Sequence, residues 1–183
     1  DIVTRFNAIY PDIEFQIIED GTITLRRQLL DANLDLALCI VGQGSAPGLR
    51  DTVLLEEEME AVLSVDNPLA RYDSLRFSQL AEQPLNLYTK YSALAEQIRD
   101  RCVKAGFLPK INITSSKVNF MLQMTEHNRG VSLLPRPYAL RSDRPNLKIV
   151  PFTGPFPWQV CITQNPHMYQ PYIAKLFEQF VVE

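Results

Sequence analysis

The sequence predicts an α/β protein with two lobes that are joined by two crossing strands. Strand-like and helix-like segments alternate in two blocks, at residues 13–41 and 85–135. The segment "MEAVLSV" (59–65) interrupts this alternation between the blocks, and "WQVCIT" (158–163) leads back from the second block. The expected bounds are residues 1–64 plus 158–183 for lobe I and 65–157 for lobe II.

The first block begins with a helix and a strand. Residues 2–10 carry apolar side chains at helical spacing, and Pro11 stops this helix. Residues 13–19 alternate isoleucine and phenylalanine with polar residues, which predicts a strand with one buried face. A helix that opens such a pattern normally follows a strand. We therefore expect the first strand of lobe I upstream of residue 1.

A turn at Gly21 leads into the second helix of this block. Thr22 or Thr24 can cap the N-terminus of that helix, because a hydroxyl oxygen accepts from free backbone N–H groups. Its expected core face consists of Leu25, Leu29 and Leu30. The following "LDLALCIV" (34–41) is apolar on both faces, as expected of a central parallel strand.

Lobe II repeats the pattern with two further helices. "LNLY" (85–88) predicts a short strand, and Ser92 is expected to cap the helix after it. "INITSS" (111–116) predicts the next strand, followed by a helix that Ser115 or Ser116 caps. "VSLLP" (131–135) predicts one more apolar strand. The expected core faces are Leu94, Ile98 and Cys102 in the first helix and Val118, Met121, Leu122 and Thr125 in the second.

The rest of the chain returns to lobe I. Residues 136–157 are rich in proline and arginine, which predicts loops around a strand at "LKIVPF" (147–152). A strand at 158–163 and a final helix complete the chain. The final helix carries a wide apolar stripe that should pack on a core, made of Tyr172, Ile173, Leu176, Phe177 and Phe180.

Composition excludes several partners. With 18 basic and 21 acidic residues, the 183-residue chain has a net charge of −3, which argues against DNA binding by this segment alone. No apolar stretch is long enough to cross a bilayer, so no membrane partner is expected. Cys39, Cys102 and Cys161 are widely spaced, which favours buried thiols in a reducing, cytoplasmic compartment over a disulfide framework.

The sequence offers little for catalysis. It contains only two histidines: His127 lies at the end of a predicted helix, away from the predicted strand ends, and His167 lies in the loop "NPHMY" (165–169). No nucleophile-elbow, metal-ligand or phosphate-loop motif is present. We therefore expect no catalytic residues, no metal ligands and no cofactor.

Hydroxyl side chains point instead to ligand binding. Thr22, Ser92 and the Ser115–Ser116 pair each lie where a helix is expected to start after a strand. Free N–H groups and the positive end of the helix dipole make such places suitable for a carboxylate or phosphate, and a cleft between the lobes would collect them. Lys90 and Lys117 would add positive charge, although a solvated lysine is the commoner case. The alternative is that the hydroxyls cap helices for stability alone.

Five segments resemble one family when read in order. They are "FNAIYPDIEFQIIEDGTITLRRQLLDANLDLALCI" (6–40), "DNPLA" (66–70), "SLRFSQLAEQP" (74–84), "AGFLPKI" (105–111) and "RGVSLLP" (129–135). Together they resemble the effector-binding domain of LysR-type transcriptional regulators. The resemblance implies two Rossmann-like lobes in the manner of type 2 periplasmic binding proteins, with a small-molecule effector between them.

The resemblance also implies site residues and partners. Matched by position, the expected effector contacts are Thr22, Ile40, Val41, Thr89, Lys90, Tyr91, Ser92, Ser115 and Ser116. DNA would be bound only through an N-terminal winged helix-turn-helix that this chain lacks, and the whole protein would be a homodimer or homotetramer. A small organic anion is the expected effector.

Two alternatives remain open on the sequence. The first is a solute-binding protein of the same fold that serves a transporter, which an upstream signal peptide would favour. The second is an enzyme on this fold, which would need an acid or base in the cleft.

Overall fold

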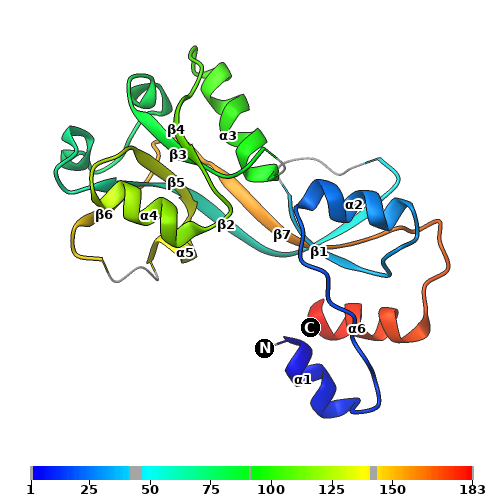
Figure 1. The fold of residues 1–183 in the computed structure, drawn as a ribbon. Coiled ribbons are helices and arrows are strands. Elements are labelled where there is room, and N and C mark those ends of the chain that lie inside the picture. The colour runs from blue at the N-terminus through cyan, green and yellow to red at the C-terminus, as the bar shows by residue number, and fades with distance from the viewer. Residues whose placement is uncertain (1, 42–46, 91, 141–143, 183) are drawn as a thin grey trace.

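Two α/β lobes lie at opposite ends of a pair of long antiparallel strands (Figure 1). The computed structural model describes residues 2–41, 47–90, 92–140 and 144–182. The long strands are β2 (Arg50–Ser64) and β7 (Pro157–Gln164). This arrangement confirms the predicted fold class, and β2 extends nine residues further toward the N-terminus than the "MEAVLSV" pattern indicates.

One strand, β2, contributes to both lobes. Its residues 50–58 pair with β7, and its residues 59–64 pair with β5 (Val131–Pro135) and β6 (Leu147–Val150). The sheet order is β1-β7-β2-β5-β3-β4, with β6 beside β2. Both connections between the lobes are therefore continuous, hydrogen-bonded strands.

In lobe I the structure corrects the predicted strand at 13–19. Residues 13–20, between α1 (Ile2–Ile9) and α2 (Thr22–Leu30), form no regular element, and Ile17 is 66% exposed. Alternation describes burial of one face, but a strand also needs a neighbour for its backbone hydrogen bonds. No described strand lies beside this segment.

The strand β1 (Ala37–Val41) is also placed differently from the prediction. It was expected at the centre of a parallel sheet, whereas it pairs antiparallel with β7 and ends the described sheet order. Leu38 on this edge strand is 49% exposed. On the opposite face, Leu25 and Leu29 of α2 pack on Cys39 and Cys161 as predicted. Leu30, also expected in this core face, is 48% exposed.

An aromatic cluster holds α1 to α6 (Tyr172–Val182). Phe6 is fully buried, and its ring centroid lies 5.0 Å from that of Phe177 and 5.3 Å from that of Phe180. Tyr172, expected in the same apolar stripe, is 77% exposed. The buried face of α6 is thus narrower than the apolar stripe in its sequence predicts.

Lobe II follows the predicted order of elements more closely. The parallel strands β3 (Pro84–Leu87), β4 (Lys110–Thr114) and β5 are flanked by α3 (Ala93–Lys104) and α4 (Val118–Glu126). The predicted core faces of α3 and α4 are confirmed, since every residue named for them is buried except half-buried Val118.

Lobe II also contains two short 3-10 helices, η1 (Pro68–Arg71) and η2 (Phe77–Leu80). Residues 136–140, predicted as loop, form the short helix α5 (Arg136–Leu140).

A buried polar network joins α4 to the sheet of lobe II. The Asn86 Nδ2 donates to Thr125 Oγ1 at 3.1 Å, and the Thr125 and Ser132 hydroxyls lie 2.7 Å apart. Asn112 Nδ2 donates to Asn86 Oδ1 at 2.9 Å. Each buried polar group in this network thus has a partner, which avoids the cost of desolvating it alone.

None of the described helices is long and apolar enough to span a bilayer. The part of the chain that the structure covers also contains no group of three or more His, Cys, Asp or Glu side chains that could hold a metal ion.

Candidate functional site

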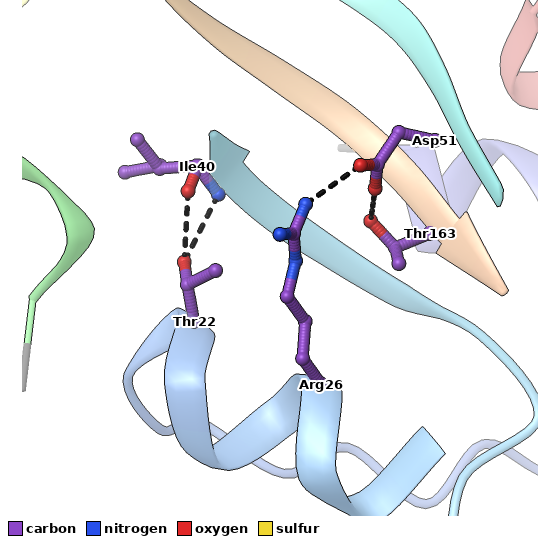
Figure 2. Close-up of polar contacts among 5 residues, drawn as sticks. All are labelled: Thr22, Arg26, Ile40, Asp51 and Thr163. Carbon is purple, nitrogen blue, oxygen red and sulfur yellow. Dashed lines mark hydrogen bonds and ion pairs between the residues drawn. The ribbon is translucent and has the colours of Figure 1, made fainter. Parts of the chain in front are cut away.

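The first helix residue of α2 binds the open edge of β1 (Figure 2). Thr22 Oγ1 donates to the Ile40 carbonyl oxygen at 3.0 Å and accepts from the Ile40 N–H at 3.2 Å. Alternate residues of an edge strand turn their N–H and C=O groups away from the paired neighbour. One threonine hydroxyl satisfies both groups of Ile40, as a neighbouring strand would.

Thr22 therefore does not cap α2 as predicted. The N-cap is Gly21, without a side-chain cap, and Thr22 is the first helical residue. In lobe II, Ser92 is the N-cap of α3, but its side chain makes no capping bond. The N-cap of α4 is Lys117 rather than either serine, and Ser115 Oγ accepts from the Lys117 N–H at 2.9 Å. Hydroxyls near a helix start have several backbone partners within reach, and tertiary contacts select among them.

An ion pair fixes the next turn of α2. Arg26, four residues after Thr22, places a guanidinium nitrogen 2.7 Å from Asp51 Oδ2 (Figure 2). Thr163 Oγ1 donates to the other oxygen of Asp51 at 2.5 Å. Since the Arg26 and Asp51 side chains are only 18% and 10% exposed, water screens this pair little. The α2 helix is thus tied by polar contacts to β1 and β2, and through Asp51 to Thr163 of β7.

Two thiols lie on the sheet face that α2 covers. Cys39 and Cys161 are directly opposite each other in the β1–β7 register, and both are fully buried. Burial raises the pKa of Cys39, although Thr163 and Arg26 act in the opposite direction. Burial, with a smaller effect of Asp51, raises the pKa of Cys161 to about 11. Both groups are therefore protonated, poorly reactive thiols at neutral pH.

The two lobes meet at the end of β1. The helix α3 of lobe II contacts β1 (Figure 1), and Ile40 packs on the core cluster that contains Leu94 from the first turn of α3. The Thr22–Ile40 contact in lobe I therefore lies next to the N-terminal end of α3. The backbone of Val41 pairs with Gln159, and its side chain lies outside the described residues.

The remaining predicted contacts lie at the carboxyl ends of β3 and β4. The Ser92 N–H donates to the Thr89 carbonyl at 3.0 Å, and exposed Lys90 lies between them in sequence. The Ser115 N–H donates to the Leu87 carbonyl at 3.0 Å, so the loops after β3 and β4 adjoin. Tyr91 lies outside the described residues, and Ser116 is exposed. Among the residues described, no hydrogen bond joins these hydroxyls to Thr22.

Two surface pockets lie away from these predicted contacts, next to α6 in lobe I. One of about 340 Å³ is lined by Arg50, Gln164, Gln170, Lys175 and Glu178, among others, and a second of about 690 Å³ lies between the start of β2 and α6. The Arg50 guanidinium pairs with Glu178 at 2.9 Å, and Gln164 Nε2 donates to the same carboxylate at 2.6 Å. Sequence reasoning named none of these residues, because a pair separated by 128 positions leaves no local pattern.

The family is decided by a match over the complete chain. Residues 1–183 match the LysR substrate binding domain. The chain belongs to this family. In this LysR-type domain, the order of the five quoted motifs is thus explained by common ancestry.

Known proteins extend this assignment. The uncharacterized HTH-type transcriptional regulator YwbI of Bacillus subtilis (strain 168) is 26% identical over 175 residues, which are 95% of this chain and 58% of the relative. The C-terminal domain of a probable LysR family transcriptional regulator from Rhodococcus sp. RHA1 has a TM-score of 0.84 at 24% identity, covering 100% of this chain and 90% of that one. The effector binding domain of QuiR in complex with shikimate has a TM-score of 0.83 at 22% identity, covering 99% and 87%. The chain thus spans little more than half the length of a curated relative, and its fold is that of LysR effector-binding domains.

We expect the Thr22–Ile40 contact to contribute to the free energy of unfolding. Replacing Thr22 with valine removes the hydroxyl but keeps the side-chain shape, so both Ile40 groups lose their partner. We expect Thr22→Val to lower the free energy of unfolding by about 1–2 kcal/mol, measured by urea denaturation. Thr22→Ser, which keeps the hydroxyl, should remain within about 0.5 kcal/mol of wild type. Equal stability of the valine variant and wild type would show that the contact contributes nothing.

Proposed function

We propose that this domain senses a small organic carboxylate, which binds between the lobes next to Thr22 and Ile40. The observation that carries the proposal is the meeting of the Thr22–Ile40 edge with the N-terminal end of α3. Backbone N–H groups at the start of a helix such as α3 favour an anion. QuiR, which shares the fold, is described in complex with a carboxylate, shikimate, and this supports the class of ligand.

Further contacts are proposed from the loops of lobe II. Thr89, Lys90, Tyr91 and Ser92 precede α3, and Ser115 and Ser116 precede α4. On the lobe I side, Ile40 and Val41 end β1. In this proposal lobe I comprises residues 1–64 plus 158–183 and lobe II residues 65–157, so that the ligand contacts both.

The regulatory step proposed is a population shift. An effector that binds one relative position of the lobes better than another changes the fraction of molecules in each. In the whole protein, a homodimer or homotetramer in the cytoplasm, this change would reach an N-terminal helix-turn-helix that binds DNA. A family of transcription regulators favours this role over a transport protein or an enzyme.

A thermal-shift experiment tests the ligand class. Shikimate and benzoate serve as probes, each compared with its neutral primary amide at equal concentration. At a concentration 100 times the dissociation constant, a ligand of the folded state adds about 2.7 kcal/mol to stability. We expect a rise in melting temperature of about 5–10 °C for a carboxylate that binds, and none for its amide. Equal effects of acid and amide, or no effect of either acid, would contradict the proposal.

A further inference from the structure

The smaller pocket next to α6 contains a buried donor that the chain leaves unpaired. Gln170, in the segment between β7 and α6, lines this pocket of about 340 Å³. Its amide Nε2 is buried and has no hydrogen-bond partner among the described residues. Buried donors are nearly always paired, because an unpaired one costs the free energy of its desolvation. The Gln170 amide is thus suited to a ligand that carries an acceptor atom.

The pocket lies on the face of the lobe I sheet opposite α2 (Figure 1). Arg50 of β2 and Gln164 of β7 are register partners, and both donate to the Glu178 carboxylate of α6, at 2.9 Å and 2.6 Å. Asp51, the next residue of β2, pairs instead with α2. Successive strand residues point to opposite faces, so the sheet separates this pocket from the α2 side.

The charged residues that line the pocket have an excess of positive charge. The Glu178 side chain is only 14% exposed, and Arg50 already neutralises its carboxylate. Lys175, one turn earlier on α6, has no carboxylate within ion-pair distance among the described residues. The first turn of α6 contains no acidic residue, so the positive end of the helix dipole adds to the same field. The pocket therefore favours an anion.

Part of the pocket wall is apolar. Pro166 and Met168 line it, and Met168 is 45% exposed. The second pocket next to α6 shares lining residues with the first and adds Val53 and Val182, which are 50% and 51% exposed. Apolar side chains gain free energy when a ligand removes them from water, which favours an anion with an apolar body over an inorganic ion.

We propose that this pocket is a second ligand site, for a small carboxylate with an apolar body. Gln170 Nε2 donates to a carboxylate oxygen, the Lys175 ammonium balances the negative charge, and the apolar body lies against Met168. The site differs from the proposed effector site, because its lining residues lie on the α6 face of the sheet rather than beside Thr22 and Ile40.

The methyl group of Met168 reports on this site directly. The chain has four methionines, and Met168 lines the pocket, whereas Met59 and Met121 are buried in the core and Met124 lies on α4. In protein labelled with ¹³C at the methionine methyl groups, the Met168→Leu variant assigns the Met168 signal. The probes titrated into the domain are hexanoate and its neutral amide, hexanamide.

We expect hexanoate, but not hexanamide, to shift the Met168 signal with a saturating curve. Gln170→Leu should raise the dissociation constant of hexanoate about tenfold, and Lys175→Met at least about threefold. Two matched controls should stay within about twofold of wild type. Gln97→Leu removes another buried, unpartnered amide, and Lys104→Met removes an exposed lysine, both on α3.

Three results would overturn the inference. They are a Met168 signal that hexanoate leaves unmoved, an equal shift with acid and amide, and unchanged affinity in both Gln170→Leu and Lys175→Met. The last would mean that the shift of Met168 arises from binding elsewhere. Each of these results leaves the proposed function standing, because the effector site between the lobes involves none of these side chains.

Discussion

Replacing Gly130 with alanine is expected to lower the free energy of unfolding by about 2–4 kcal/mol. A Cβ atom at this position would lie 2.8 Å from the Pro84 carbonyl oxygen and 3.1 Å from Asn86 Oδ1. The first of these atoms is backbone and cannot move away alone, and the second belongs to the buried network with Thr125. In addition, Gly130 has a φ of +107°, which is strained for any residue with a Cβ. Chemical denaturation of wild type and variant measures the loss.

Gly106 provides the matched control for this effect. It also has a positive φ, +88°, at the end of α3, but no atom lies within 4 Å of a Cβ built there. Gly106→Ala should therefore cost only the backbone strain, about 1–2 kcal/mol. An equal loss in both variants would mean that the close approach of Gly130 to Pro84 and Asn86 has no energetic consequence.

The second large effect is expected at Phe6. Phe6→Ala should lower the free energy of unfolding by about 3–5 kcal/mol. Phe6 is the buried residue of α1, and its ring contacts those of Phe177 and Phe180. The helix α1 should then separate from α6. Hydrogen exchange measures this separation as lost protection of the α1 amides, together with a lower denaturation midpoint.

Ile9 on the same helix is the control for Phe6. It is 57% exposed, so Ile9→Ala should change stability by less than about 0.5 kcal/mol. If Phe6→Ala leaves the exchange of α1 unchanged, the aromatic cluster does not hold α1 in place.

Most elements of the fold could be predicted because their signals are local. The stripe of Leu94, Ile98 and Cys102 lies within one helix and needs no knowledge of its neighbours. The prediction at 13–19 failed for the opposite reason. Its alternation is real at Ile13 and Phe15, which are half-buried, but forming a strand depends on a second segment that sequence periodicity does not reveal.

The candidate site was predicted less completely, because its contacts join distant segments. The sequence indicates a role for the Thr22 hydroxyl at the start of α2, but its partner, Ile40, lies 18 positions away and the contact depends on how α2 packs on β1.

The distance between the lobes tests the proposed sensor most directly. Spin labels placed through Arg27→Cys on α2 and Gln123→Cys on α4 would be exposed, one on each lobe. The native thiols Cys39, Cys102 and Cys161 are fully buried and should escape labelling. Pulsed electron paramagnetic resonance then gives the distribution of label distances with and without the carboxylate that most raises the melting temperature. We expect the carboxylate to move the population toward one distance, while its amide leaves the distribution unchanged. An identical distribution with and without saturating carboxylate would contradict sensing by a shift of lobe positions.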